Sequence, residues 1–80
     1  MSWFVEKTPE VAKAFSELRS SVYKEGALDA RTKELISIAA SVLMRCEKCT
    51  DIHDQRVRKY GATDEQIAEA IACALSLIHI

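Results

Sequence analysis

The sequence has few residues that interrupt helices, with only two glycines and one proline among 80 residues. Aromatic residues are also scarce at 6 %, whereas apolar residues reach 49 % and Ala, Leu, Ile, Glu and Lys are abundant. This composition favours helices over strands. We therefore predict an all-α fold, an antiparallel bundle of about four helices formed by a single domain over residues 1–80.

Neither sign of charge dominates, since 11 Lys and Arg residues are interspersed with 12 Asp and Glu residues. No basic stripe alternates with aromatic residues, so nucleic-acid binding is unsupported. The longest apolar run, residues 35–44, is interrupted by two serines and is too short to span a membrane. Residues 1–10 lack the basic and apolar segments of a signal peptide. We expect a cytoplasmic protein without nucleic-acid or membrane partners.

Capping and breaking residues divide the first half of the chain into two helices. Thr8 and Pro9 are typical of a helix start, and Gly26 of a helix end. Asp29 suits the cap of a second helix over about residues 30–44. The apolar positions of that helix predict a broad buried stripe, made of Leu35, Ile36, Ala39, Val42 and Leu43.

The second half predicts two more helices. A break near Arg45 lets a third helix start at the C-x-x-C motif and run to about Tyr60, before Gly61. Residues 63–66 read as a capping box that opens a fourth helix, with an apolar stripe that extends to Ile78. Cys73 lies on this helix among alanines, and we expect it in the core.

The last six residues, 75–80, match one reading frame of a transposase end sequence that is used to make sequencing libraries. We therefore expect a chain that is truncated at its C-terminus, with residues 75–80 non-native. The alternative is a native segment, because Ile78 continues the apolar stripe of the fourth helix.

Cys46, Cys49 and His53 carry the chemistry that the sequence suggests. On a helix they fall at about 0°, 300° and 340°, so both sulfurs and the imidazole share one stripe. Backbone N–H groups at a helix start favour a thiolate, and two thiols one turn apart can form a disulfide. His53 can act as the base for Cys49. We predict a redox site without metal or organic cofactor.

Glu34 completes the pattern E-x11-C-x2-C-x3-H. It lies about 18 Å before Cys46 along a straight helix. In an antiparallel hairpin it would come beyond His53, nearer Arg56, so contact with a cysteine would need a bridge through His53 and water. The alternative is a first-turn glutamate that favours the helix dipole.

Two other interpretations of the cysteines remain open. Cys46, Cys49 and His53 could bind zinc if Cys73 or Asp54 were recruited as a fourth ligand. The cysteines could also be small buried side chains that only pack.

The set Glu34, Cys46, Cys49 and His53 resembles the signature of the alkyl hydroperoxidase D-like proteins of the carboxymuconolactone decarboxylase superfamily. Residues 28–36 are similar to the family's helix before the site, and residues 60–67 to the Gly-Ala-Thr turn after it. The resemblance covers about residues 10–74.

The resemblance implies a helical subunit that forms trimers or hexamers and reduces hydroperoxides or disulfides with a dithiol electron donor. It implies Cys49 as the peroxidatic cysteine and Cys46 as the proton donor and resolving cysteine. His53 and Glu34 would form the proton relay. Well-studied peroxidase members carry a further histidine where this chain has Lys48, which cannot shuttle protons near neutral pH.

The residues leave two alternative functions open. One is a carboxymuconolactone decarboxylase-like lyase, which needs cations to hold carboxylates. The other is a non-enzymatic, redox-sensing oligomerisation module. A small chain with a broad apolar surface is expected to form a homo-oligomer in any of these cases.

Overall fold

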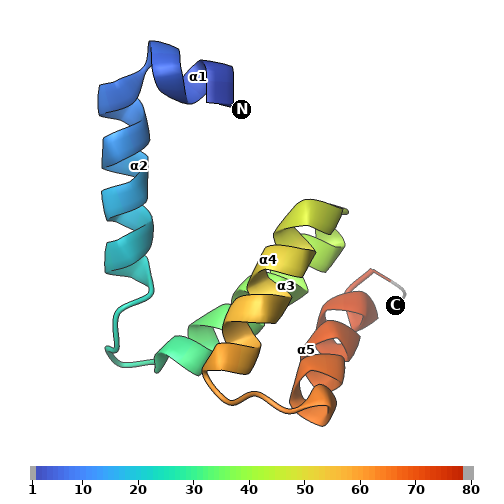
Figure 1. The fold of residues 1–80 in the computed structure, drawn as a ribbon. Coiled ribbons are helices and arrows are strands. Elements are labelled where there is room, and N and C mark those ends of the chain that lie inside the picture. The colour runs from blue at the N-terminus through green and yellow to red at the C-terminus, as the bar shows by residue number, and fades with distance from the viewer. Residues whose placement is uncertain (1, 79–80) are drawn as a thin grey trace.

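The computed structural model describes residues 2–78, and all regular structure among them is helical (Figure 1). The predicted all-α class is confirmed. The helices are α1 (Ser2–Lys7), α2 (Pro9–Val22), α3 (Ala30–Leu43), α4 (Glu47–Lys59) and α5 (Asp64–Ser76). The short helix α1 was not predicted, so the C-x-x-C motif opens the fourth helix rather than the third. No helix in the described part of the chain is long and apolar enough to cross a membrane.

The predicted caps of α3 and α5 are confirmed. The Asp29 side chain accepts a 2.7 Å hydrogen bond from the backbone N–H of Thr32. At the start of α5, Thr63 and Gln66 form the reciprocal capping box. Gly61 follows α4 with φ 87°, a left-handed conformation that glycine adopts without steric cost. These caps set the boundaries of the helices that surround the site.

The helix start predicted at Thr8 and Pro9 is confirmed, because Thr8 is the N-cap residue of α2 and Pro9 is its first residue. The Thr8 side chain does not cap α2, since its hydroxyl donates to the Phe4 carbonyl of α1. The predicted extension of the last helix to Ile78 was wrong. Ile78 lies beyond the last residue of α5, Ser76, so it does not continue that helix. Residues 79 and 80 of the segment expected to be non-native lie outside the described residues.

Helices α3, α4 and α5 pack together around the core, and α4 runs back along α3 (Figure 1). The buried core residues are Ile38, Val57, Ala62 and Ile67. The stripe predicted for α3 was misplaced, since Ile36 is 54 % exposed. The most buried face of α3 instead contains the polar residues Glu34 and Ser41, which hydrophobic patterning does not count.

Cys73 is exposed rather than in the core. Successive helical residues are rotated by about 100°, and α5 turns its neighbour Ala74 inward. The cysteine therefore points away from α3.

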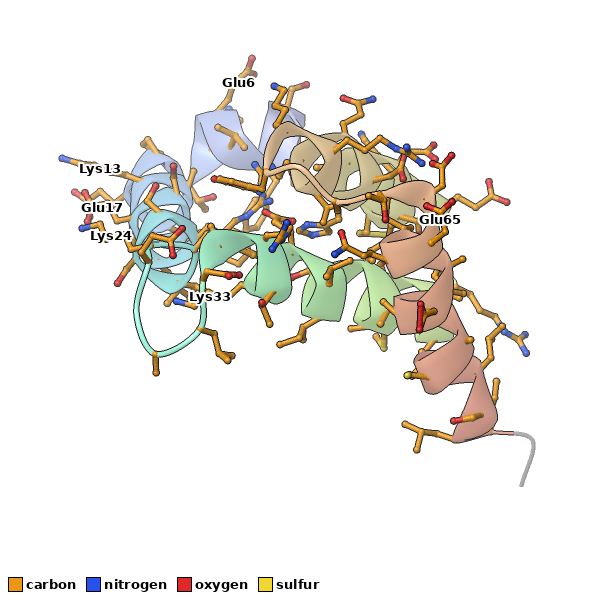
Figure 2. All side chains as sticks on the ribbon, turned by 90° about the horizontal axis from the view of Figure 1, so that it is seen from below. Glu6, Lys13, Glu17, Lys24, Lys33 and Glu65 are labelled. Atoms are coloured by element: carbon orange, nitrogen blue, oxygen red, sulfur yellow. A yellow bond between two sulfur atoms is a disulfide. The ribbon has the colours of Figure 1, made fainter. Side chains whose placement is uncertain are left out.

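Helix α2 stands apart from the α3–α5 core (Figure 1). Lys33 of α3 links the end of α2 to the core, because its ammonium donates hydrogen bonds to the carbonyls of Val22 and Lys24. Figure 2 shows the charged side chains Lys13 and Glu17 pointing away from the core. The apolar side chains of α2 are also exposed, and they are Val11, Phe15, Leu18 and Val22. The radius of gyration is 14.3 Å, against about 12 Å for a compact domain of this length.

Candidate redox site

The site is centred on a disulfide between Cys46 and Cys49, whose Cα atoms are 5.3 Å apart. After α3, Arg45 adopts a left-handed backbone conformation with φ 56°. Cys46 follows as the N-cap residue of α4. The backbone N–H of Cys49 donates to the sulfur of Cys46 at 3.3 Å. Such a donor at a helix N-terminus stabilises a thiolate once the disulfide is reduced. The structure thus pairs the two predicted cysteines at the predicted end of the helix.

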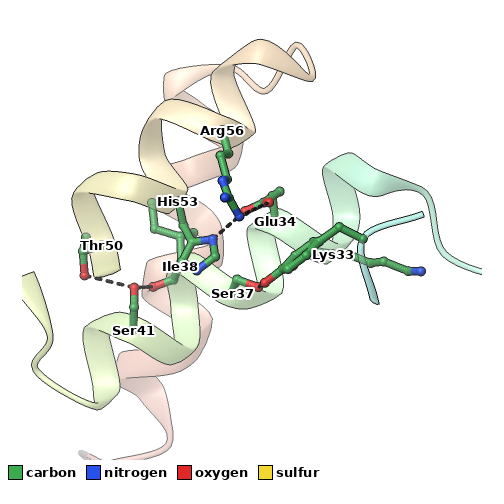
Figure 3. A network of polar contacts seen from close by, with 9 residues as sticks. Lys33, Glu34, Ser37, Ile38, Ser41, Thr50, His53 and Arg56 are labelled. Carbon is green, nitrogen blue, oxygen red and sulfur yellow. Dashed lines mark hydrogen bonds and ion pairs between the residues drawn. The ribbon is translucent and has the colours of Figure 1, made fainter. Parts of the chain in front are cut away.

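Glu34 and His53 form the second part of the site (Figure 3). The Glu34 carboxylate lies 2.6 Å from Nδ1 of His53, and its residue is only 1 % exposed. When Nδ1–H donates to the carboxylate, Nε2 is the ring nitrogen that remains for another partner. The guanidinium of Arg56 is 3.9 Å from the other carboxylate oxygen. Every buried side-chain polar atom in the described residues has a partner.

This arrangement refines the placement that the sequence predicted for Glu34. The carboxylate lies beside His53 and near Arg56, as the antiparallel hairpin implies. No hydrogen bond joins it to either cysteine among the described residues, and His53 is its hydrogen-bond partner. The direct bond to His53 arises because both side chains turn into the α3–α4 interface.

A cavity of about 450 Å³, here called the apolar cavity, lies between α2 and α4. Cys49 and His53 both line it, so the two residues border a shared space. Its other walls are mainly apolar and consist of Phe15, Leu18, Arg19, Val22, Tyr23 and Ile52. This space can receive an organic molecule beside the Cys49 sulfur.

Tyr23 is a site residue that the sequence analysis missed. Its ring centroid is 6.0 Å from that of His53. Its hydroxyl makes a short hydrogen bond to Ser37 on α3. Tyr23 therefore holds the end of α2 against α3, and its ring lies beside the His53 imidazole. No spacing signal links it to the cysteines, since contact depends on the α2–α3 loop.

A second cavity, of about 400 Å³ and here called the polar cavity, lies at the start of α4. Its lining residues are Ser41, Val42, Arg45, Cys46, Glu47, Thr50 and Asp51. The hydroxyls of Ser41 and Thr50 are 3.0 Å apart (Figure 3). Thr50 also donates to the Cys46 carbonyl. The hydroxyl pair holds the first turn of α4 against α3. Sequence analysis missed it because serine and threonine at these positions form no recognisable motif.

A third cavity, of about 570 Å³, lies between α2 and the ends of α3 and α4 and is rich in cations. Arg19, Lys24, Arg56 and Lys59 line it together with the Glu34 carboxylate. Arg19 also lines the apolar cavity, so the two spaces share a wall.

An all-α fold with a cysteine pair at a helix start and a buried Glu–His pair defines a protein equipped for thiol–disulfide chemistry. The model of the carboxymuconolactone decarboxylase family matches residues 9–78. The chain belongs to this family, in its alkyl hydroperoxidase D-like group.

Similar proteins cover most of this chain. An uncharacterised protein of the cox locus of Paracoccus denitrificans is 44 % identical over 80 % of the chain. The alkyl hydroperoxide reductase AhpD of Maricaulis maris is 30 % identical over 91 % of it. A carboxymuconolactone decarboxylase family protein of Legionella pneumophila has a TM-score of 0.87 at 37 % identity, over 95 % of this chain and 68 % of that protein. The chain spans 58 % of the Paracoccus protein and 42 % of the Maricaulis protein.

Proposed function

We propose that this protein is a thiol-dependent peroxidase or disulfide oxidoreductase that works through Cys46 and Cys49. The observation that carries the proposal is the 2.6 Å Glu34–His53 pair, whose imidazole shares a cavity with the Cys49 sulfur. A cysteine pair that only packed would need neither an oriented base nor an accessible sulfur. Instead, Cys49 is exposed and Cys46 is half-buried.

In the oxidative half-reaction, the Cys49 thiolate attacks the distal oxygen of a hydroperoxide in the apolar cavity. The O–O bond breaks, the alkoxide takes a proton and leaves as an alcohol, and Cys49 becomes a sulfenic acid. Cys46 then attacks the Cys49 sulfur and displaces water, which forms the disulfide. A dithiol donor returns both cysteines to the reduced state, and its own two thiols become a disulfide.

His53 is the proton carrier of this scheme, and Glu34 is a positioning residue. The carboxylate holds the ring through Nδ1, so that Nε2 can accept the proton of the Cys49 thiol and return it to the leaving alkoxide. The cation Lys48 is also available to favour a thiolate, although it moves no proton near neutral pH.

The comparisons support this proposal through the relatives named alkyl hydroperoxide reductase AhpD, including the Maricaulis maris protein. Cys46 and Cys49 form a disulfide, His53 pairs with Glu34, and Cys49 and His53 line the same cavity, which supports the same roles for this set of residues.

Peroxide consumption with dithiothreitol as the electron donor tests the proposal. We expect Cys49→Ser to abolish turnover of cumene hydroperoxide, because it removes the attacking sulfur. Cys73→Ser is the matched control, since this free cysteine is exposed on α5, and its rate should stay within about two-fold of wild type. Equal rates for the wild type and Cys49→Ser would contradict the proposal.

A lyase that acts on a small lactone acid is the second candidate. The observation in its favour is the cation-rich cavity, where Arg19, Lys24, Arg56 and Lys59 could hold carboxylates. Lactone decarboxylation by the double variant Cys46→Ser/Cys49→Ser at the wild-type rate would favour the lyase, since that chemistry needs neither thiol.

A further inference from the structure

The two cysteines of the disulfide line different cavities. Cys49 lines the apolar cavity between α2 and α4, and Cys46 is not among its walls. Cys46 lines the polar cavity at the start of α4, and Cys49 is not among its walls. The disulfide therefore lies between two separate openings of the protein.

The chemical character of the two cavities differs because α4 divides them. Asp51 faces the polar cavity, whereas its neighbour Ile52 faces the apolar one. A neutral organic hydroperoxide gains free energy when it leaves water for apolar walls. A thiolate loses hydration there, and the hydroxyls and the Arg45 guanidinium of the polar cavity can replace that hydration better.

Access also decides which sulfur a thiolate can attack. Thiol–disulfide exchange proceeds along the S–S axis, so that the nucleophile approaches from the side opposite to the leaving sulfur. A thiolate in the polar cavity meets Cys46 and has Cys49 as its leaving group. Cys49 would leave into the cavity that contains His53.

We propose that hydroperoxide and reductant use opposite openings: the hydroperoxide reaches Cys49 through the apolar cavity, and the dithiol attacks Cys46 through the polar cavity. The route of the hydroperoxide rests on the proposed function. The route of the dithiol depends only on the disulfide.

The reductive step balances as a two-stage exchange. One thiolate of the donor bonds to the Cys46 sulfur, the Cys46–Cys49 bond breaks, and Cys49 leaves as a thiolate. The donor's second thiol loses its proton and attacks its own bound sulfur, which closes the donor disulfide and releases the Cys46 thiolate. The Cys49 N–H, 3.3 Å from the Cys46 sulfur, stabilises that second leaving group.

The charges of the polar cavity predict which donors react well. Glu47 and Asp51 outnumber Arg45 there, so the cavity disfavours anionic thiols. At equal thiolate concentration, we expect cysteamine to reduce the disulfide faster than 2-mercaptoethanol, and 3-mercaptopropionate to be slowest. Asp51→Asn should raise the rate of reduction by 3-mercaptopropionate about two- to five-fold, because it removes a negative charge from the cavity. Glu17→Gln, an acid on the outer face of α2, is the control and should change no rate.

Mapping of the attacked sulfur is the direct test. The oxidised protein, carrying Cys73→Ser, is mixed with 2-mercaptoethanol, quenched in acid and alkylated with N-ethylmaleimide. Trypsin cleaves after Lys48, so Cys46 and Cys49 fall in different peptides for mass spectrometry. We expect the mixed disulfide on Cys46 and the maleimide on Cys49. A mixed disulfide on Cys49 would overturn the proposal.

The two half-reactions provide the second test, with neighbouring residues as a matched pair. Ile52→Asn should slow oxidation by cumene hydroperoxide about five- to ten-fold and leave reduction by thiols unchanged. Asp51→Asn should leave oxidation by cumene hydroperoxide unchanged and change only the reductive step, which becomes faster for an anionic thiol. Ile36→Asn, at an exposed position outside both cavities, is the control.

The outcomes separate this inference from the proposed function. If no variant or wild type consumes peroxide, the proposed function fails, and the mapping experiment still decides where a thiol attacks. If peroxide is consumed but Asp51→Asn and Ile52→Asn change the rate of the same half-reaction, the division between the openings is wrong and the peroxidase proposal stands.

Discussion

Replacement of Glu34 by glutamine tests the proposed relay most sharply. Glutamine keeps the volume and the carbonyl acceptor of glutamate, so His53 Nδ1–H can still donate a hydrogen bond. What disappears is the negative charge, which in the wild type lies 2.6 Å from the imidazole in a site where Glu34 is 1 % exposed. The substitution therefore isolates the electrostatic support of the ring.

The size of the effect follows from the hydrogen bond that is weakened. A hydrogen bond to a charged group is worth about 1.5–3 kcal/mol net, which corresponds to about 10- to 150-fold in rate. We expect Glu34→Gln to slow the oxidative half-reaction by a factor in this range. His53→Gln removes the proton carrier itself, and a loss of about 10²–10⁴-fold is expected.

Because Glu34 acts through His53, the two substitutions should not be additive. The double variant Glu34→Gln/His53→Gln should react no more than about three-fold more slowly than His53→Gln alone. Arg56→Gln is the control, since its guanidinium is 3.9 Å from the carboxylate and 41 % exposed. Its rate should stay within about three-fold of wild type.

The assay is a quenched-flow count of thiols. Each reduced protein is mixed with excess cumene hydroperoxide, quenched in acid at increasing times and titrated for remaining thiols. Circular dichroism confirms that each variant is folded. A wild-type rate for Glu34→Gln, or a double variant whose loss equals the product of the single losses, would refute the relay.

Other predictions concern stability and assembly. Ile38→Ala should lower the free energy of unfolding by about 2–5 kcal/mol in urea titrations, and Ile36→Ala by less than about 0.5 kcal/mol, because only Ile38 is buried; similar losses would contradict this core. Hydrogen bonds from Thr32 lower the pKa of Asp29 below its usual 3.8, so its carboxylate stabilises the fold above that pH. The stability advantage over Asp29→Asn should shrink as the pH falls through the lowered pKa; a constant difference from pH 6 to pH 2 would contradict this. Since α2 exposes an apolar face, light scattering should detect a homo-oligomer rather than a monomer.

Much of the fold could be predicted because capping residues have local causes. Asp29, Gly61 and the Thr63 box each act within a few residues, so their sequence signals survive in the structure. The start of α4 at the cysteine pair was predicted for the same reason. The helix start at Thr8 and Pro9 was predicted as well, but the Thr8 side chain does not cap α2, because α1 supplies a competing carbonyl acceptor.

Tertiary contacts account for what the sequence could not provide. Hydrophobic patterning misplaced the buried face of α3, because Glu34 and Ser41 are buried through polar partnerships across the interface with α4. The exposure of Cys73 depends on a one-residue rotation of α5. The position of α2, and with it one wall of the apolar cavity, depends on a loop without a regular pattern.

One measurement tests the redox proposal most directly: reaction of the fully reduced protein with one equivalent of cumene hydroperoxide, followed by mass spectrometry. We predict rapid loss of two hydrogen atoms, a disulfide between Cys46 and Cys49, and a Cys73 thiol that still accepts an alkylating reagent. Cysteines that react no faster than a free thiol, or a disulfide that involves Cys73 instead, would contradict the proposed function.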